Sequence, residues 1–137
     1  MNYKGYLIDK SGNKFFPDLY DSGWKIAELS SNFKPYDNNE NNKVRYRRIG
    51  NMVQIKGIVS PKSTIEGSTA MKTIFNLPDG FKPSVNTYQI CQGTGMNRWL
   101  LTVYTTGEVG FSRYGTNNLT DASTTVWLPF NVVYFTE

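Results

Sequence analysis

The sequence predicts an all-β protein built as an antiparallel β-sandwich or barrel. Short segments in which apolar and polar residues alternate recur about every ten residues, as half-buried strands do. Gly, Pro and Asn cluster between these segments, where tight chain reversals need them. Aromatic residues make up 15% of the chain, and they suit the pleated surface of a sheet. No stretch combines a helical period with capping residues.

The length of 137 residues predicts one domain with a substantial core. We expect residues 1–22 to form a short N-terminal segment with a hairpin around a turn at 10–13. Residues 23–137 then form a single β-sandwich or barrel domain. The run 24–29 alternates as a strand with Trp24, Ile26 and Ala27 partly toward the core. The run 36–43 is almost wholly polar and predicts a mobile, solvated loop.

Residues 44–59 read as two strands that reverse at Gly50-Asn51. Val53, Ile55 and Val59 share one face at a period of two, while Gln54 and Lys56 point the other way.

The same reasoning predicts further strands along the rest of the chain. Their expected ranges are 69–77, 87–92, 98–105, 108–113, 124–128 and 130–135. Pro129 marks a break or an edge between the last two, because proline cannot donate to a strand ladder. Residues 114–123 form a polar loop. The final strand looks apolar on both faces, as in a central strand or a subunit contact.

Alternation also predicts the core. The expected members are Val53, Ile55, Trp99, Leu101, Val103, Val109, Phe111 and Val133. Trp24 and Trp127 are also interpreted as core rather than as ligand platforms.

Catalytic and cofactor chemistry finds little support, so we expect a protein that is not an enzyme and uses no cofactor or metal. The chain has no histidine, and Cys91, its only cysteine, lies in a strand-like stretch without a histidine base. Gly93-Thr-Gly95 precedes a strand rather than a helix, so it reads as a hairpin turn and not a phosphate loop. The few carboxylates show no sign of converging as a glycosidase pair.

The net charge of +4 permits an anionic partner such as nucleic acid, teichoic acid or an acidic polysaccharide. The basic cluster, which we define as Lys43, Arg45, Arg47 and Arg48, could form a single-strand nucleic-acid groove. The alternative is an exposed strand face covered by long polar side chains. The N-terminus lacks a signal-peptide pattern, and no run is long enough to predict a membrane span.

Saccharide-binding proteins without metal stack an aromatic ring on the apolar face of the sugar and place Asn, Asp, Arg or Gln around it to bond the hydroxyls. Two loop tips here have that composition, one beside Trp99 and one after the strand 108–113. The candidate saccharide-binding residues are Asn97, Arg98, Arg113, Tyr114, Asn118 and Asp121. Asn117 belongs to the same loop.

The order of these segments resembles a known family. The segments that carry the resemblance are, in order, Gly23-Trp24, the run 44–57, the run 77–83 (Leu-Pro-Asp-Gly-Phe-Lys-Pro), a hairpin at 98–113 and a terminal strand pair at 126–135. Together they are similar to the receptor-binding head domains of tail-fibre and baseplate proteins of phages that infect Gram-positive bacteria.

The resemblance implies a jelly-roll-like β-sandwich or barrel that forms a homotrimer, binds host cell-wall saccharide and contacts other tail proteins. It also implies synthesis in the host cytoplasm and incorporation into the virion tail. The chain departs from the family in having no long N-terminal stem within its sequence. Two alternatives remain open: a small β-barrel that binds single-stranded nucleic acid through the basic cluster, and an assembly protein without a ligand.

Overall fold

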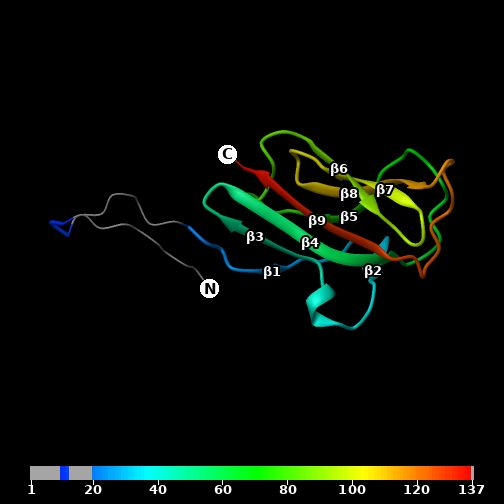
Figure 1. The fold of residues 1–137 in the computed structure, drawn as a ribbon, viewed down its shortest axis with the longest axis horizontal. Coiled ribbons are helices and arrows are strands. Elements are labelled where there is room, and N and C mark those ends of the chain that lie inside the picture. The colour runs from blue at the N-terminus through cyan, green and yellow to red at the C-terminus, as the bar shows by residue number, and fades with distance from the viewer. Residues whose placement is uncertain (1–9, 13–19, 137) are drawn as a thin grey trace.

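The all-β, antiparallel prediction is confirmed by a computed structural model that describes residues 10–12 and 20–136 (Figure 1). These residues form nine strands and one short 3-10 helix, and they contain no α-helix. The elements are β1 (Lys25–Ile26), β2 (Phe33–Pro35), η1 (Glu40–Asn42), β3 (Arg45–Ile49), β4 (Met52–Pro61), β5 (Lys72–Asn76), β6 (Thr87–Gln92), β7 (Arg98–Val103), β8 (Glu108–Gly115) and β9 (Leu128–Phe135). The hairpin expected around residues 10–13 falls largely outside the described residues.

The strands form two antiparallel sheets packed face to face (Figure 1). The first runs β1-β3-β4-β9, with β2 paired to the far end of β4 on the side of β3. The second runs β5-β8-β7-β6. One border between the sheets is bridged, because the Ser30 N–H donates to the Ile74 carbonyl at 2.8 Å and Leu29 pairs with Phe75.

The opposite border, between β6 and β9, has no backbone ladder among the described residues. The Gln89 side-chain amide crosses it to the Asn131 carbonyl at 3.3 Å. The sandwich is therefore closed along one border and open along the other.

The central hairpin forms as the sequence predicts. β3 and β4 pair with Ile49 opposite Met52, so Gly50 and Asn51 make a two-residue turn. Gly50 takes a φ of 58°, which a side chain would resist, whereas Asn51 has no positive φ. Val53, Ile55 and Val59 are fully buried.

The core is centred on Trp99, which is 1% exposed and packs 5.4 Å from the Phe111 ring and 6.0 Å from the Phe130 ring. Of the eight residues predicted for the core, Val133 alone is not buried. The prediction failed there because β9 pairs with β4 in a register that sets Val132 beside Ile55 and Tyr134 beside Val53. Those two face inward, and Val133 faces solvent at 50% exposure.

The final strand is therefore buried on one face, not on both. Phe135 shares the solvent side of β9 with Val133 and is 67% exposed. Pro129 lies inside β9 rather than dividing it. β9 tolerates proline because it is an edge strand, with β4 as its one ladder partner in the described sheets.

Two tryptophans predicted for the core are at the surface. Trp24 is 37% exposed and Trp127 is 36% exposed. Trp24 lies on the solvent face of the first sheet, where the Lys56 ammonium sits 4.7 Å from its ring centroid. Ile26, also predicted partly toward the core, is 57% exposed because β1 is a short edge strand. The described residues include no helix that could cross a membrane.

Candidate functional site

A β-bulge interrupts the pairing of β7 and β8 next to Arg113. Arg98 pairs with Gly115 but Leu100 pairs with Ser112, so β8 contains one more residue than β7 over this step. Arg113 takes the strain with a φ of 60°, the one positive φ found for a non-glycine residue in the described chain. Residues other than glycine adopt this conformation rarely, and such outliers concentrate at binding and catalytic sites.

The bulge decides which side chain faces solvent. In a regular strand Arg113 would follow Phe111 onto the core side. The extra residue reverses the alternation, so Arg113 is exposed and Tyr114 is buried 6.2 Å from the Phe111 ring. The Arg113 N–H donates to the Ser68 carbonyl at 3.1 Å, outside the sheet.

The chain after β8 folds back tightly. Gly115 has a φ of 148°, and a Cβ there would lie 2.0 Å from the Asn118 carbonyl oxygen, so only glycine fits. Gly115 pairs with Leu119, and the Thr120 N–H donates to the Tyr114 carbonyl at 2.9 Å. This return holds residues 116–119 beside the end of β7.

These features enclose a hollow of about 320 Å³, which we call the cleft. Trp99 and Leu100 contribute from β7, and Ile90 and Leu119 add apolar borders. Its full lining is Ile90, Arg98, Trp99, Leu100, Arg113, Gly115, Thr116, Asn117, Asn118 and Leu119.

The cleft is positively charged and its cations are free. Arg98 and Arg113 are both exposed, and neither makes a side-chain hydrogen bond or ion pair with any described residue. No carboxylate lines the cleft. A guanidinium group donates in a planar fork that matches a carboxylate or phosphate, and it also donates to hydroxyls. The cleft can therefore bind polar ligands, preferentially anionic ones.

The structure brings together three of the six predicted site residues, Arg98, Arg113 and Asn118. The other three do not line the cleft. The Asn97 side chain donates to the Thr94 carbonyl at 2.9 Å, within the turn before β7. Tyr114 faces the core because of the bulge. The Asp121 carboxylate accepts from the Gly67 N–H at 2.9 Å, which ties two loops together.

Sequence reasoning missed the apolar borders of the cleft. Ile90 is 72% exposed, because it points to the opposite face of β6 from its buried neighbour Cys91. That alternation with Cys91 is the signal that could have placed Ile90 at the surface. Leu119 lies in a loop expected to be polar, and its part in the cleft depends on the return at Gly115.

The basic cluster is engaged in internal contacts, in contrast to the cleft. Lys43 forms an ion pair with Glu40 at 2.8 Å, and Arg45 donates to the Glu40 and Lys43 carbonyls. Arg48 donates to the carbonyls of Gly50 and Gly80, both at 2.7 Å.

Arg47 of the same cluster forms two hydrogen bonds to Asp21, of which the Nε–Oδ1 bond is 2.9 Å. Asp21 is 2% exposed. The Arg47 hydrogen bond, helped by the Gly23 N–H, holds the pKa of Asp21 below its ordinary value.

Groups with catalytic potential lie apart from the cleft. Burial raises the pKa of the Cys91 thiol to about 12, so the nucleophilic thiolate is scarce at neutral pH. Across residues 10–12 and 20–136, no three Cys, His, Asp or Glu side chains gather as a metal site would require. No family model matches the chain, and no curated protein sequence matches it either.

Proposed function

We propose that this chain is a non-enzymatic binding module that recognises cell-wall saccharide through the cleft. The observation that carries the proposal is the convergence of Arg98, Arg113, Asn117 and Asn118 on one hollow. The strained backbone of Arg113 supports the proposal, because an arginine occupies a positive-φ position that glycine would adopt without strain.

The lining of the cleft offers partners to both the apolar face and the polar groups of a sugar. Ile90, Leu100 and Leu119 offer an apolar surface to the C–H face of a sugar ring. The amides of Asn117 and Asn118 offer donors and acceptors to hydroxyls, and the two arginines favour a unit that bears phosphate or carboxylate. A saccharide with an anionic substituent uses all of these groups together.

The resemblance to phage receptor-binding heads suggests where such a module acts. In that setting the chain forms a homotrimer at the virion tail and contacts other tail proteins. Exposed Met52, Val133 and Phe135, neighbours on the solvent face of β4 and β9, support an association surface. Light scattering at micromolar concentration should give three times the 15.6 kDa mass of one chain, and a monomer mass would oppose the trimer.

The nucleic-acid alternative has weaker support than the saccharide proposal. Each cation of the basic cluster already binds a carboxylate or carbonyl of the protein. Binding of single-stranded nucleic acid there would have to displace these contacts. A ligand-free assembly role stays a possible outcome of the binding experiment.

The proposal is tested by binding to Gram-positive cells and to purified wall polymer, with an oligonucleotide as the control polymer. We expect wild-type protein to bind cells and polymer, and Arg113→Ala to bind at least about tenfold more weakly because it leaves ligand groups unpaired. Lys62→Ala removes the same charge from an exposed position outside the cleft and should bind normally. Equal binding by wild type and a folded Arg113→Ala would reject the cleft, and no binding by wild type would reject the function.

A further inference from the structure

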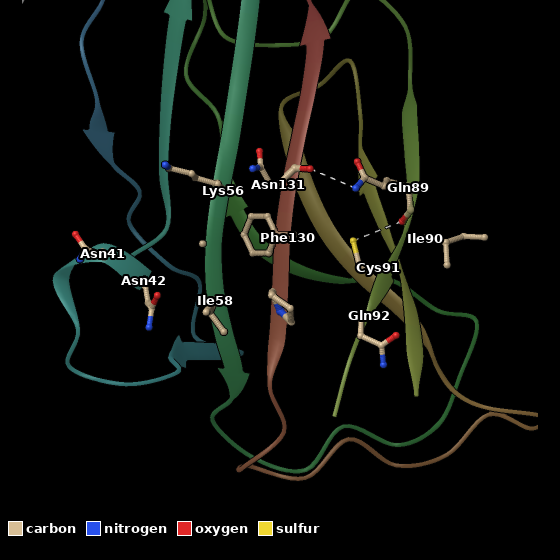
Figure 2. Close-up of a pocket in the computed structure, with 12 residues that line it drawn as sticks. Asn41, Asn42, Lys56, Ile58, Gln89, Ile90, Cys91, Gln92, Phe130 and Asn131 are labelled. Atoms are coloured by element: carbon tan, nitrogen blue, oxygen red, sulfur yellow. Dashed lines mark hydrogen bonds between the residues drawn. The ribbon is translucent and has the colours of Figure 1, made fainter. Parts of the chain in front are cut away.

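A second hollow of about 400 Å³, which we call the groove, lies along the open border between β6 and β9. Figure 2 shows Gln89 of β6 and Asn131 of β9 facing each other, with Cys91 and Gln92 further along β6. Its lining is Asn41, Asn42, Lys56, Gly57, Ile58, Gln89, Ile90, Cys91, Gln92, Pro129, Phe130 and Asn131.

The groove follows from the missing ladder. One side-chain bond, from the Gln89 amide to the Asn131 carbonyl, joins the two strands at one end. Beyond it, no hydrogen bond connects Gln92 with Pro129, and the hollow runs across β9 and β4 toward η1 (Figure 2). Asn41 and Asn42 of η1 form the far wall.

The chemistry of the groove differs from that of the cleft. Five amide side chains line it, with no carboxylate and one cation, Lys56, whose ammonium lies 4.7 Å from the Trp24 ring centroid. The side chain of Asn41 makes no hydrogen bond with a described residue, while the Gln89 and Gln92 amides use only their nitrogens. Ile58 and Pro129 add apolar surface. The Asn42 amide nitrogen donates to Asp37, and the Asn131 amide oxygen accepts from Gln54. The groups left free by the described residues include the Asn41 amide and the side-chain oxygens of Gln89 and Gln92. Beside an apolar floor they suit the hydroxyls and C–H faces of uncharged sugar units.

Ile90 connects the two hollows, because it lines both of them. It lies on the edge strand β6 and is 72% exposed, and its side chain points away from β9 in Figure 2. The two hollows therefore meet the same side chain on this edge strand. A ligand chain that contacts Ile90 from the cleft is directed toward the groove.

We propose that the cleft and the groove are two parts of one extended binding surface for a saccharide chain of several units. The cleft holds a unit that bears a phosphate or carboxylate, and the groove holds neighbouring uncharged units. This inference rests on the proposed function and adds to it that the ligand is a polymer segment rather than a single sugar. Affinity must then rise with chain length until both hollows are filled.

The probes are fragments of purified Gram-positive wall polymer, separated by number of repeats. A phosphate-bearing polymer and a uronic-acid polymer distinguish the two sources of negative charge, and neutral dextran is the uncharged control. We expect affinity to rise at least about tenfold from the shortest fragments to long ones and then to level off.

Two variants with matched controls locate the effect. Asn41→Ala changes the far wall of the groove, and Asn38→Ala changes an exposed residue of the same loop outside it. Ile90→Glu puts a negative charge on the shared border, and Val85→Glu puts it at a similarly exposed apolar residue, 67% against 72%, that lines neither hollow. We expect Asn41→Ala to weaken long fragments several-fold and spare short ones, and Ile90→Glu to weaken both about tenfold.

The outcomes separate the two proposals. Length-independent affinity, or unchanged binding of long fragments by a folded Asn41→Ala, overturns the extended surface while the cleft remains a saccharide site. No binding of any fragment or intact polymer by the wild type overturns the proposed function itself. If Ile90→Glu and Val85→Glu lose the same binding affinity, the loss comes from the added negative charge and not from its position. That outcome also overturns the extended surface.

Discussion

The arginines of β3 and those of the cleft belong to the same residue type and play opposite parts. Arg47 and Arg48 lie on a strand of regular geometry, and their guanidinium groups are bound by Asp21 and by the carbonyls of Gly50 and Gly80. Arg98 and Arg113 flank a bulge, and their guanidinium groups bind no described residue. The first pair ties segments of the chain together, and the second pair is available to a ligand.

The difference teaches that clustering in sequence is a poor guide to free charge. The basic cluster is dense along the chain, yet the fold supplies each of its cations with a partner. The two cleft arginines are 15 positions apart in numbering and form no charge cluster along the chain, yet the pairing of β7 with β8 brings them to one hollow. Availability depends on what the surrounding backbone and carboxylates leave unsatisfied.

The largest expected effect in this comparison is on stability, from Arg47→Ala. The change leaves the Asp21 carboxylate buried without its cation, and such orphaned charges are strongly destabilising. Urea unfolding should show a larger loss of stability than in any other arginine variant, with wall-polymer binding by the folded fraction unchanged. If Arg98→Ala destabilised the protein as much, the contrast between the two arginine groups would fail.

The next effect separates binding from stability at Arg113. Arg113→Gly should lower polymer binding about tenfold, as Arg113→Ala does. Unlike alanine, glycine relieves a conformation that costs an L-residue roughly 1–2 kcal/mol, and its greater freedom in the unfolded chain offsets roughly 0.5–1 kcal/mol of that gain. Thermal unfolding should therefore show the Gly variant up to about 1 kcal/mol more stable than the Ala variant. A Gly variant less stable than the Ala variant would contradict the backbone strain assigned to this position.

The pH dependence sharpens the contrast further. Because the folded-state pKa of Asp21 lies below its ordinary value of 3.8, the pair stabilises the protein at higher pH, and this contribution is lost as the pH falls below that value. The pKa of Asp79 at the surface is also lowered, by Lys82, so Asp79 contributes its own pH dependence. Comparing the stability of wild type with that of Asp21→Asn isolates the contribution of Asp21. The stability difference between them should shrink between about pH 5 and pH 2. A constant difference would assign Asp21 no such role.

The smallest effect is that of salt. Raising the ionic strength from about 0.05 to about 0.5 M should weaken binding of an anionic polymer several-fold, because the cleft cations are exposed and screened. The Arg47–Asp21 pair is shielded by its buried carboxylate, so the midpoint of urea unfolding should move little. Polymer binding that ignores salt would point to an uncharged ligand.

The strands could be predicted because their signals are local. Period-two alternation in 53–59 and 99–111, and Gly50 at a tight turn, do not depend on the rest of the fold. The face of β9 could not be predicted, because Val132 and Val133 are equally apolar and only the register with β4 chooses between them. The prediction that Trp24 is buried failed for a related reason. Its ring is contacted by Arg47 and Lys56 from other strands, and the local sequence does not show these contacts.

The site was half predictable for the same physical reason. Loop composition identified Arg98, Arg113 and Asn118, which line the cleft. It could not identify the bulge that turns Tyr114 into the core, because no residue pattern announces one extra residue in a strand. The groove depends on two strand edges that lie about 40 residues apart in sequence, and local pattern does not show that these edges fail to pair.

The place of β9 in the first sheet has a consequence for synthesis of the protein. The second sheet is complete once residue 115 has left the ribosome, but β4 must wait for residues 128–135 to cover its free edge. Until then Val53 and Ile55 lack Tyr134 and Val132 as neighbours, and β4 presents an unpaired apolar edge. The nascent chain is therefore most prone to aggregation just before β9 emerges, and a chaperone that shields β4 would act in that interval.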